Sequence, residues 1–192
     1  KAFSMRQEQI KILAERCRLF LSRTEPDLLR ESIPCWAEFA RSSEPVPWDK
    51  RGTLTYRPIR ESEEWGEAWD SAWFHLQAEL PEAWTGRPVA LRLNLSGENL
   101  LFDADGVPVA GLTAYSVLNP DYTKEFFPLP ESFRRGGKFD LWLEAAASSN
   151  FGVYLAEDPH RLTTRTQGWF AAKAETMRLG VFHTDLWHLR IE

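Results

Sequence analysis

The stretch Trp65-Gly66-Glu67-Ala68-Trp69-Asp70-Ser71-Ala72-Trp73-Phe74 holds three tryptophans and runs directly into an alternating pattern that ends at Leu80. Alternation with a period of two is typical of a strand with one buried face. The pattern puts Phe74 on the inward face and Trp73 on the opposite one. Trp65 and Trp69 fall in the loop that leads into this strand. We therefore expect Phe74 in a core, while Trp65, Trp69 and Trp73 face whatever lies outside it.

Other stretches of the chain also have the composition and alternation of strands. They are Thr53 to Ile59, Val89 to Leu95, Leu100 to Asp103, Val107 to Leu112, Tyr122 to Leu129, Phe139 to Glu144, Phe151 to Leu155 and Ala174 to Phe182. Asp105-Gly106 predicts a hairpin turn, because both residues tolerate a positive φ. Many short strands at hairpin spacing, without helices between them, predict an antiparallel sandwich or barrel and not a parallel α/β sheet.

The N-terminal part of the chain has helical character. Apolar residues at Ile10, Leu13, Ala14, Cys17 and Leu21 share one face, which predicts an amphipathic docking helix over Gln7 to Ser22. Its other face mixes acidic and basic residues, which favours solvent over a membrane surface.

A proline-rich connector is expected between this helix and the strands. Pro26, Pro34, Pro45 and Pro47 each restrict the preceding residue, so Thr24 to Arg51 is predicted to be an irregular wrapping segment. Its large residues Trp36, Phe39 and Trp48 would hold it against the domain. At the far end, Thr184-Asp185 predicts a helix start. We expect a helix and connector over residues 1–50, a sandwich over 51–183 and the start of a linker over 184–192.

Composition narrows the classes of function. The chain has 192 residues and a formal net charge of -5 without a basic stripe, which argues against nucleic acid as a partner. It has no apolar run of the ~20 residues that a bilayer requires and no signal-peptide pattern, so we expect a cytoplasmic protein without membrane contact. Cys17 and Cys35 lack zinc or redox spacing and are interpreted as buried thiols.

The search for a catalytic or metal site finds no constellation. His183, Asp185 and His188 are grouped, but their spacing puts the histidines on different helical faces, so we do not expect a metal site. The acidic residues Glu61, Glu63, Glu64 and Glu67 could be the paired carboxylates of a glycosidase, yet a solvated loop is the better interpretation.

The order of features from Trp65 onwards resembles the N-terminal domain of glycoside hydrolase family 38 α-mannosidases of the bacterial and cytosolic type. The residues that carry the resemblance are Trp65-Gly66, Trp73-Phe74, Leu80-Pro81, Leu91 to Leu95, the hairpin Leu101 to Leu112 with Asp105-Gly106 and Gly111-Leu112, Leu143-Glu144-Ala145, Phe151-Gly152 and Asp185-Leu186. The resemblance covers roughly residues 50 to 192.

This resemblance implies a galactose-binding-like jelly roll placed ahead of a catalytic barrel that hydrolyses α-mannosidic bonds with zinc and an aspartate nucleophile. The chain stops before the His-x-His-x-Asp-like motif with which that barrel opens. The resemblance thus implies a glycosidase as the parent protein, whereas these residues include no catalytic group, zinc ligand or other cofactor site of their own.

Three hypotheses for the domain follow. In the first, it packs against its own catalytic domain or other subunits of a homo-oligomer. In the second, it binds mannose-containing glycans, with Trp65, Trp69 or Trp142 stacked on a sugar and Asn94 or Gln77 bonded to its hydroxyls. In the third, it is an enzyme that uses the Glu61 to Glu67 cluster. The first is favoured, because tryptophan enrichment suits interfaces and no acid/base pair is visible beside the cluster.

Overall fold

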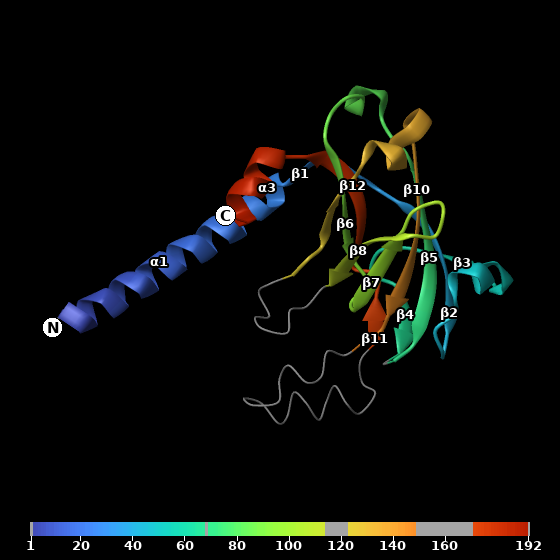
Figure 1. The fold of residues 1–192 in the computed structure, drawn as a ribbon, viewed down its shortest axis with the longest axis horizontal. Coiled ribbons are helices and arrows are strands. Elements are labelled where there is room, and N and C mark those ends of the chain that lie inside the picture. Colours follow the sequence, from blue (N-terminus) through green and yellow to red (C-terminus); the bar gives the residue numbers. More distant parts are fainter. Residues whose placement is uncertain (1, 68, 114–122, 149–170, 192) are drawn as a thin grey trace.

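The computed structural model describes residues 2–67, 69–113, 123–148 and 171–191. Within these ranges two antiparallel sheets pack face to face, and a long helix leads away from them (Figure 1). The helices are α1 (Ala2–Thr24) and α3 (Thr184–Ile191), and the short 3-10 helices are η1 (Glu25–Asp27), η2 (Trp48–Thr53), η3 (Glu82–Trp84) and η4 (Glu131–Gly137). The strands are β1 (Leu29–Pro34), β2 (Trp36–Ser42), β3 (Arg57–Ile59), β4 (Glu64–Glu67), β5 (Ser71–Glu79), β6 (Val89–Asn94), β7 (Glu98–Phe102), β8 (Pro108–Thr113), β9 (Phe126–Pro128), β10 (Lys138–Ala146), β11 (Ala171–Lys173) and β12 (Thr176–Phe182).

The larger sheet has the strand order β3-β2-β5-β10-β7-β8, and the smaller one has the order β1-β12-β6-β9. Strand β5, which the opening stretch predicted, lies inside the larger sheet between β2 and β10. Its pairing with β10 runs from Lys138 opposite Glu79 to Ala146 opposite Ser71 without a break. The predicted antiparallel sandwich is confirmed.

One hydrophobic core fills the space between the two sheets. Phe74 is fully buried in it, as the alternation predicted; its ring stacks on Phe39 at 5.4 Å and meets the edge of Trp65 at 5.5 Å. The larger sheet contributes Leu76, Leu141 and Leu143 from β5 and β10, and the smaller sheet contributes Leu91, Leu93, Met177 and Leu179. The core therefore depends on the inward residues of alternating strands.

The connector between α1 and the strands is not irregular, which corrects the sequence-based prediction for Thr24 to Arg51. It contains β1, an edge strand of the smaller sheet, and β2, an interior strand of the larger one. Pro34 is the last residue of β1, where a missing N–H is tolerated because the strand lies at the edge. Phe39 is in the core as expected, but Trp36 is 50% exposed and does not hold the segment down.

The outward orientation predicted for Trp65 and Trp73 is also wrong, because both side chains are buried, at 2% and 1% exposure. Trp65 lies on the short strand β4, which pairs with β11, and its indole N–H donates to the Leu95 carbonyl oxygen at 2.9 Å. Trp73 does lie on the face opposite Phe74, but Trp48 and Phe102 cover that face there, at 5.7 and 5.1 Å between centroids.

The hairpin of β7 and β8 turns at Asp105-Gly106 as predicted. Gly106 has a φ of +81°, and a Cβ there would lie 2.4 Å from the indole nitrogen of Trp48. Of the other predicted strands, Thr53 to Ile59 is reduced to β3 and Tyr122 to Leu129 to β9, while Phe151 to Leu155 lies outside the described residues. The helix predicted at Thr184 is confirmed as α3.

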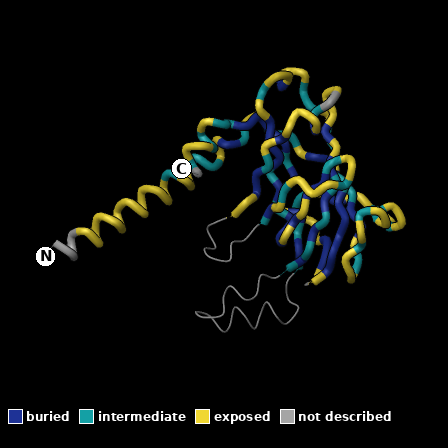
Figure 2. Tube along the Cα trace, viewed as in Figure 1, coloured by how far each residue is buried: buried dark blue, intermediate teal, exposed yellow. Residues whose placement is uncertain are grey.

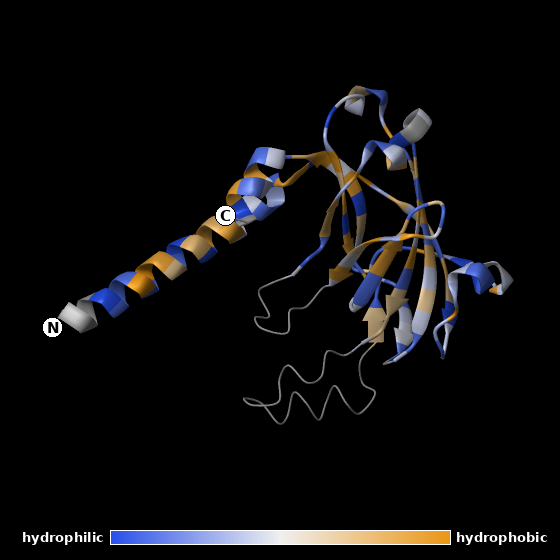
Figure 3. Ribbon diagram, in the orientation of Figure 1, coloured by the Kyte–Doolittle hydropathy of each residue, from blue (hydrophilic) through white to orange (hydrophobic). Residues whose placement is uncertain are grey.

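Helix α1 is confirmed as a helix, yet most of its length lies away from the sandwich (Figures 1 and 2). Cys17, expected to be buried, is exposed on it, whereas Cys35 is buried in the core. Hydrophobic and hydrophilic residues alternate along the helix in Figure 3. In the described part of the chain, neither helix is long and apolar enough to cross a membrane.

Candidate functional site

We use the term outer face for the side of the larger sheet that points away from the core. Side chains alternate between the two sides of each strand, and most inward positions are aliphatic. The outward positions are therefore mainly aromatic and charged. The residues of the outer face, from β2, β5, β7 and β10, are Trp36, Glu38, Trp73, His75, Gln77, Glu79, Glu98, Leu100, Phe102, Lys138, Asp140, Trp142 and Glu144. Register places Trp36, Gln77 and Asp140 in one row across the sheet. Glu38, His75 and Trp142 form the next row.

His75 is at the centre of the outer face. Its Nε2 lies 3.0 Å from Asp140 Oδ2, and its Nδ1 lies 3.4 Å from Glu38 Oε1. Gln77 Nε2 donates to the same Asp140 oxygen at 2.6 Å. The histidine ring is therefore held between carboxylates from strands on both sides of β5.

Trp142 was a candidate for stacking on a sugar, and the structure shows what already surrounds its ring. The His75 imidazole lies parallel to it at 4.1 Å between centroids. The Arg51 guanidinium lies over it at 4.8 Å, and Tyr56 meets it edge-on at 5.5 Å. A role for Trp142 in binding stays a prediction, and these contacts leave less of the indole free for a ligand.

Two open depressions lie side by side on the outer face, near the end of β5 and the start of β10. One, of about 380 Å³, is lined by Trp36, Gln77, Ala78, Glu79, Lys138, Phe139 and Asp140. The other, of about 440 Å³, is lined by Phe102, Asp103, Ala104, Asp105, Ser132, Phe133, Lys138, Asp140 and Trp142. Lys138 and Asp140 border both depressions, and we use the term groove for the two together.

The sequence reasoning missed Trp36 as a residue of this surface. It assigned Trp36 to an irregular segment, although Ala37 and Phe39 alternate with Trp36 and Glu38 in the pattern of a strand. Gln77, proposed for bonding to a sugar, does line the groove. Asn94 does not, because it lies on the smaller sheet and donates to Glu125 at 2.7 Å. Trp69 is 57% exposed and lies in the turn before β5, outside the groove.

Two groups near the groove have altered acidity. Burial raises the pKa of Tyr56 to about 12, with Arg51 opposing the shift and Glu38 adding to it. Burial alone raises the pKa of the Glu144 carboxyl on β10. Glu144 has no ion pair or hydrogen bond to another described residue.

Three carboxylates of the acidic cluster already have polar partners. Glu61 accepts from the Met177 backbone N–H at 2.9 Å and from Arg178 at 3.4 Å, while Glu64 lies 3.9 Å from Lys173 and Glu67 lies 3.7 Å from Arg41. Glu61 thus contacts β12, and Glu64 and Glu67 of β4 contact β11 and β2. Within the described ranges, no group of three or more His, Cys, Asp or Glu side chains is arranged to hold a metal ion. His183, Asp185 and His188 do not form such a group either.

Comparison with known proteins identifies related chains. A family model described as the jelly roll domain of α-mannosidase matches residues 33–174. Mouse α-mannosidase 2C1 is 27% identical over 156 residues, and the human protein of that name is 28% identical over 156 residues. Each match covers 78% of this chain and 14% of the relative, so the chain spans about a seventh of the length of these relatives.

Among solved structures, β-glucuronidase from Ruminococcus gnavus is similar with a TM-score of 0.43 and 9% identity. The similarity covers 79% of this chain and 28% of that one. A TM-score of this size carries no argument about function.

Proposed function

This chain belongs to the family of α-mannosidase jelly roll domains, and from this we propose that it is the non-catalytic sandwich domain of a cytoplasmic, zinc-dependent α-mannosidase of glycoside hydrolase family 38. In this proposal the hydrolysis of α-mannosidic bonds belongs to a catalytic domain outside these residues. The zinc belongs to that domain as well. The role of the sandwich is to pack against the catalytic domain or against another subunit.

The exposed apolar side chains of α1 carry this proposal. Ile10 and Leu13 are 61% and 62% exposed, and Ile12, Leu19 and Leu21 are exposed as well. Helices shorter than about 12–15 residues are marginal alone, and even longer ones are stabilised mainly by burying an apolar face. Ile10, Leu13 and Leu21 share one face of α1 at helical spacing, and exposed apolar surface marks protein contact sites. The packing surface is thus α1, and not Trp65 and Trp73 as the sequence suggested.

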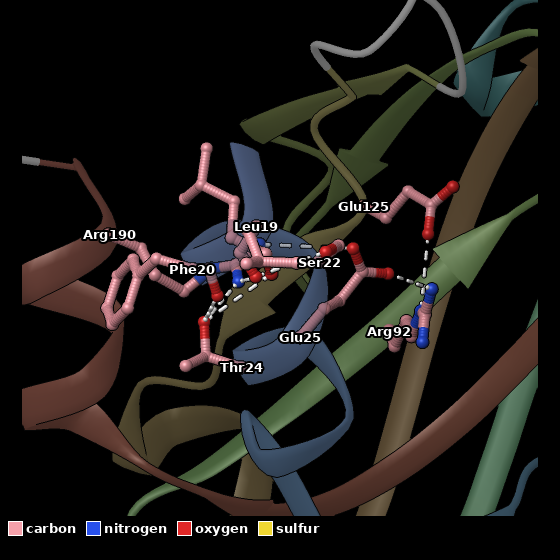
Figure 4. Close-up of polar contacts among 9 residues, drawn as sticks. Leu19, Phe20, Ser22, Thr24, Glu25, Arg92, Glu125 and Arg190 are labelled. Atoms are coloured by element: carbon pink, nitrogen blue, oxygen red, sulfur yellow. Dashed lines mark hydrogen bonds and ion pairs between the residues drawn. The ribbon is translucent and has the colours of Figure 1, made fainter. Parts of the chain in front are cut away.

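The base of α1 is firmly fixed to the sandwich, which supports a defined partner position (Figure 4). Arg190 of α3 donates to the Leu21 carbonyl oxygen and, at 2.8 Å, to Thr24 Oγ1. Glu25 then pairs with Arg92 at 2.7 Å, and Arg92 reaches Glu125 at 3.2 Å. Since ion pairs that form a network hold geometry better than isolated pairs, α1 should keep one direction relative to the sheets.

The experiment that tests this proposal measures binding of an apolar fluorescent dye and the mass of the chain in solution. We expect the chain to bind the dye or to self-associate. Ile10→Ser with Leu13→Ser should abolish both effects, whereas Leu189→Ser, on the exposed side of α3, should not. A monomeric chain that binds no dye would contradict the proposal.

A second candidate function is a module that binds mannose-containing glycans. The observation that favours it is the groove, where exposed Trp36 lies beside Gln77 and Asp140. An aromatic face with adjacent amide and carboxylate groups suits a sugar ring and its hydroxyls.

Titration with manno-oligosaccharides, followed by tryptophan fluorescence and calorimetry, tests this second function. Binding should be lost in Trp36→Ala and weakened in Gln77→Ala, and it should persist in Trp69→Ala, which serves as the exposed-tryptophan control. If millimolar sugar causes no change in the unaltered chain, this function is excluded.

A further inference from the structure

Trp36 lies between two depressions at one end of the larger sheet. It lines the part of the groove that measures about 380 Å³, and it also lines a further depression of about 560 Å³ outside the groove. We use the term edge depression for this further one, because Pro58 of the edge strand β3 and the following residues Arg60 and Glu61 also line it. Since β2 lies between β3 and β5, Trp36 separates the edge depression from the groove.

We propose that the groove and the edge depression together bind a linear, uncharged oligosaccharide of three or more sugar residues, with the indole of Trp36 stacked on a residue inside the chain. The inference rests on the glycan-binding function given above as the second candidate, and it specifies the ligand of that site. The ligand is an internal stretch of a glycan chain and not a terminal mannose.

The depressions follow one another across the strands. The row of Trp36, Gln77 and Asp140 crosses β2, β5 and β10, and the groove then reaches Asp103 after the end of β7. Neighbouring strands lie ~4.8 Å apart, so the three spacings from β2 to β7 cover about 14 Å. The edge depression extends this path beyond Trp36. A path of this length exceeds one sugar ring.

Each depression along the path has room for a sugar residue. The volumes are about 560, 380 and 440 Å³, and pockets of roughly 300–1,000 Å³ hold whole small ligands. Neighbouring depressions share lining residues, which are Trp36 for the first two and Lys138 with Asp140 for the last two. The depressions therefore adjoin, and consecutive sugar residues can occupy them.

The short helix η2 leaves this path open, although it covers the neighbouring rows of the outer face. The Trp48 ring packs on Trp73, and the Arg51 guanidinium lies over Trp142. Trp36, by contrast, is 50% exposed. It is therefore the tryptophan of the outer face that can stack on a ligand, and η2 borders the path without crossing it.

Polar side chains along the path have unused capacity for hydrogen bonds. Within the described part of the chain, Glu79, Lys138, Ser132 and Arg60 make no ion pair or side-chain hydrogen bond. Glu79 and Lys138 line the part of the groove next to Trp36, Ser132 lines its far part, and Arg60 lines the edge depression. Each of the three depressions thus offers a partner for sugar hydroxyls.

The charges along the path favour an uncharged ligand. Lys138 borders both parts of the groove and Arg60 borders the edge depression, while the Arg51 guanidinium lies beside the groove. An anionic ligand would meet a carboxylate in every depression, and a cationic one would meet Lys138 or Arg60. Hydroxyl groups both donate and accept hydrogen bonds, so they suit side chains of either sign. The carboxylates are those of Glu61, Glu79, Asp103, Asp105 and Asp140.

A series of ligands of increasing length tests the proposal. The chain is titrated in a calorimeter with mannose and with linear α-linked manno-oligosaccharides of two, three and four residues. We expect the affinity to rise at least about tenfold from mannose to the trisaccharide, because each added residue fills another depression. The tetrasaccharide should bind about as tightly as the trisaccharide.

Two substitutions at opposite ends of the path test its extent. Arg60→Ser in the edge depression and Ser132→Ala in the groove should each weaken the trisaccharide at least about threefold and leave the affinity for mannose unchanged. Arg23→Ser on α1 and Ser43→Ala after β2 are the matched controls, because both residues are exposed and line none of the three depressions. Thermal unfolding confirms that each variant folds.

Three results would overturn the inference. Equal affinity for mannose and the trisaccharide would keep the glycan-binding function and limit the site to one sugar residue. Length-dependent binding that either end variant leaves unchanged would exclude the depression concerned from the site. Tighter binding of a phosphorylated mannose than of mannose would contradict the uncharged ligand. If the unaltered chain binds none of these sugars, the glycan-binding function itself is wrong.

Discussion

The imidazole of His75 lies parallel to the indole of Trp142, with 4.1 Å between the ring centroids and an angle of 5° between the planes. The two residues are opposite each other on β5 and β10, so the register of the central strand pair sets this contact. The same histidine reaches Asp140 and Glu38 through its two nitrogens. One side chain of β5 thus contacts both neighbouring strands, β2 and β10.

Substitutions of His75 should separate its stacking from its polar contacts. His75→Phe keeps a ring over Trp142 and loses the contacts with Asp140 and Glu38, whereas His75→Ala loses both. We expect a loss of unfolding free energy of about 1–3 kcal/mol for alanine and a smaller loss for phenylalanine. Urea unfolding measures both, and equal losses would show that the stack contributes nothing.

Trp65 and Trp69 should respond very differently to removal. Trp65→Ala leaves a cavity in the core and the Leu95 carbonyl oxygen without its donor, so we expect a loss of about 3–5 kcal/mol. Trp69→Ala removes a mostly exposed ring and should cost less than about 1 kcal/mol. Chemical unfolding of both variants gives the comparison. Similar losses for the two would contradict the burial of Trp65 and the exposure of Trp69.

Gly86 serves as a control for Gly106 in the turn between β7 and β8. Both have a positive φ, but a Cβ at Gly106 would meet the Trp48 indole, while one at Gly86 would meet nothing within 4 Å. Gly86→Ala should therefore cost about 1 kcal/mol from backbone strain, and Gly106→Ala about 1–3 kcal/mol more, because of the clash. Thermal unfolding distinguishes them, and an equal decrease in Tm would rule out the Trp48 contact.

The two thiols should differ in reactivity. Cys17 is exposed on α1, whereas burial raises the pKa of Cys35 to about 12, with Glu61 adding to the shift and Arg178 opposing it. Since the thiolate is the reactive form, the folded and dilute chain should titrate with one equivalent of a thiol reagent at mildly alkaline pH. Denaturation should expose the second. Rapid reaction of both thiols in the folded chain would contradict this.

Glu144 should make the stability of the domain depend on pH. Burial raises the pKa of its carboxyl in the folded state, so the protonated form is favoured there. The corresponding stability is fully present below the pKa of the unfolded chain and is lost as the pH rises through the folded pKa. Glu144→Gln should therefore stabilise the domain at neutral pH and have little effect in acid. Urea unfolding of both proteins from acid to neutral pH measures the difference in unfolding free energy. If Glu144→Gln stabilised the domain only in acid, the predicted direction of the pH dependence would be wrong.

The sequence by itself determined the class of fold and most of its strands. Alternation between Ala72 and Leu80 predicted a strand with one buried face and assigned Phe74 to the core, because side chains two residues apart point to the same side of a strand. The turn at Asp105-Gly106 was equally clear, since few residues tolerate its backbone angles.

Only the tertiary structure decided which tryptophans are exposed. Alternation tells which side of a strand a residue occupies but not what covers that side, so Trp73 was taken as outward although Trp48 lies over it. Trp36 was missed because the nearby prolines obscured the pattern of β1 and β2. The sheet accommodates Pro34 because this residue is the last one of an edge strand. The groove and the isolated helix α1 likewise depend on contacts between segments far apart in the chain, which no local pattern records.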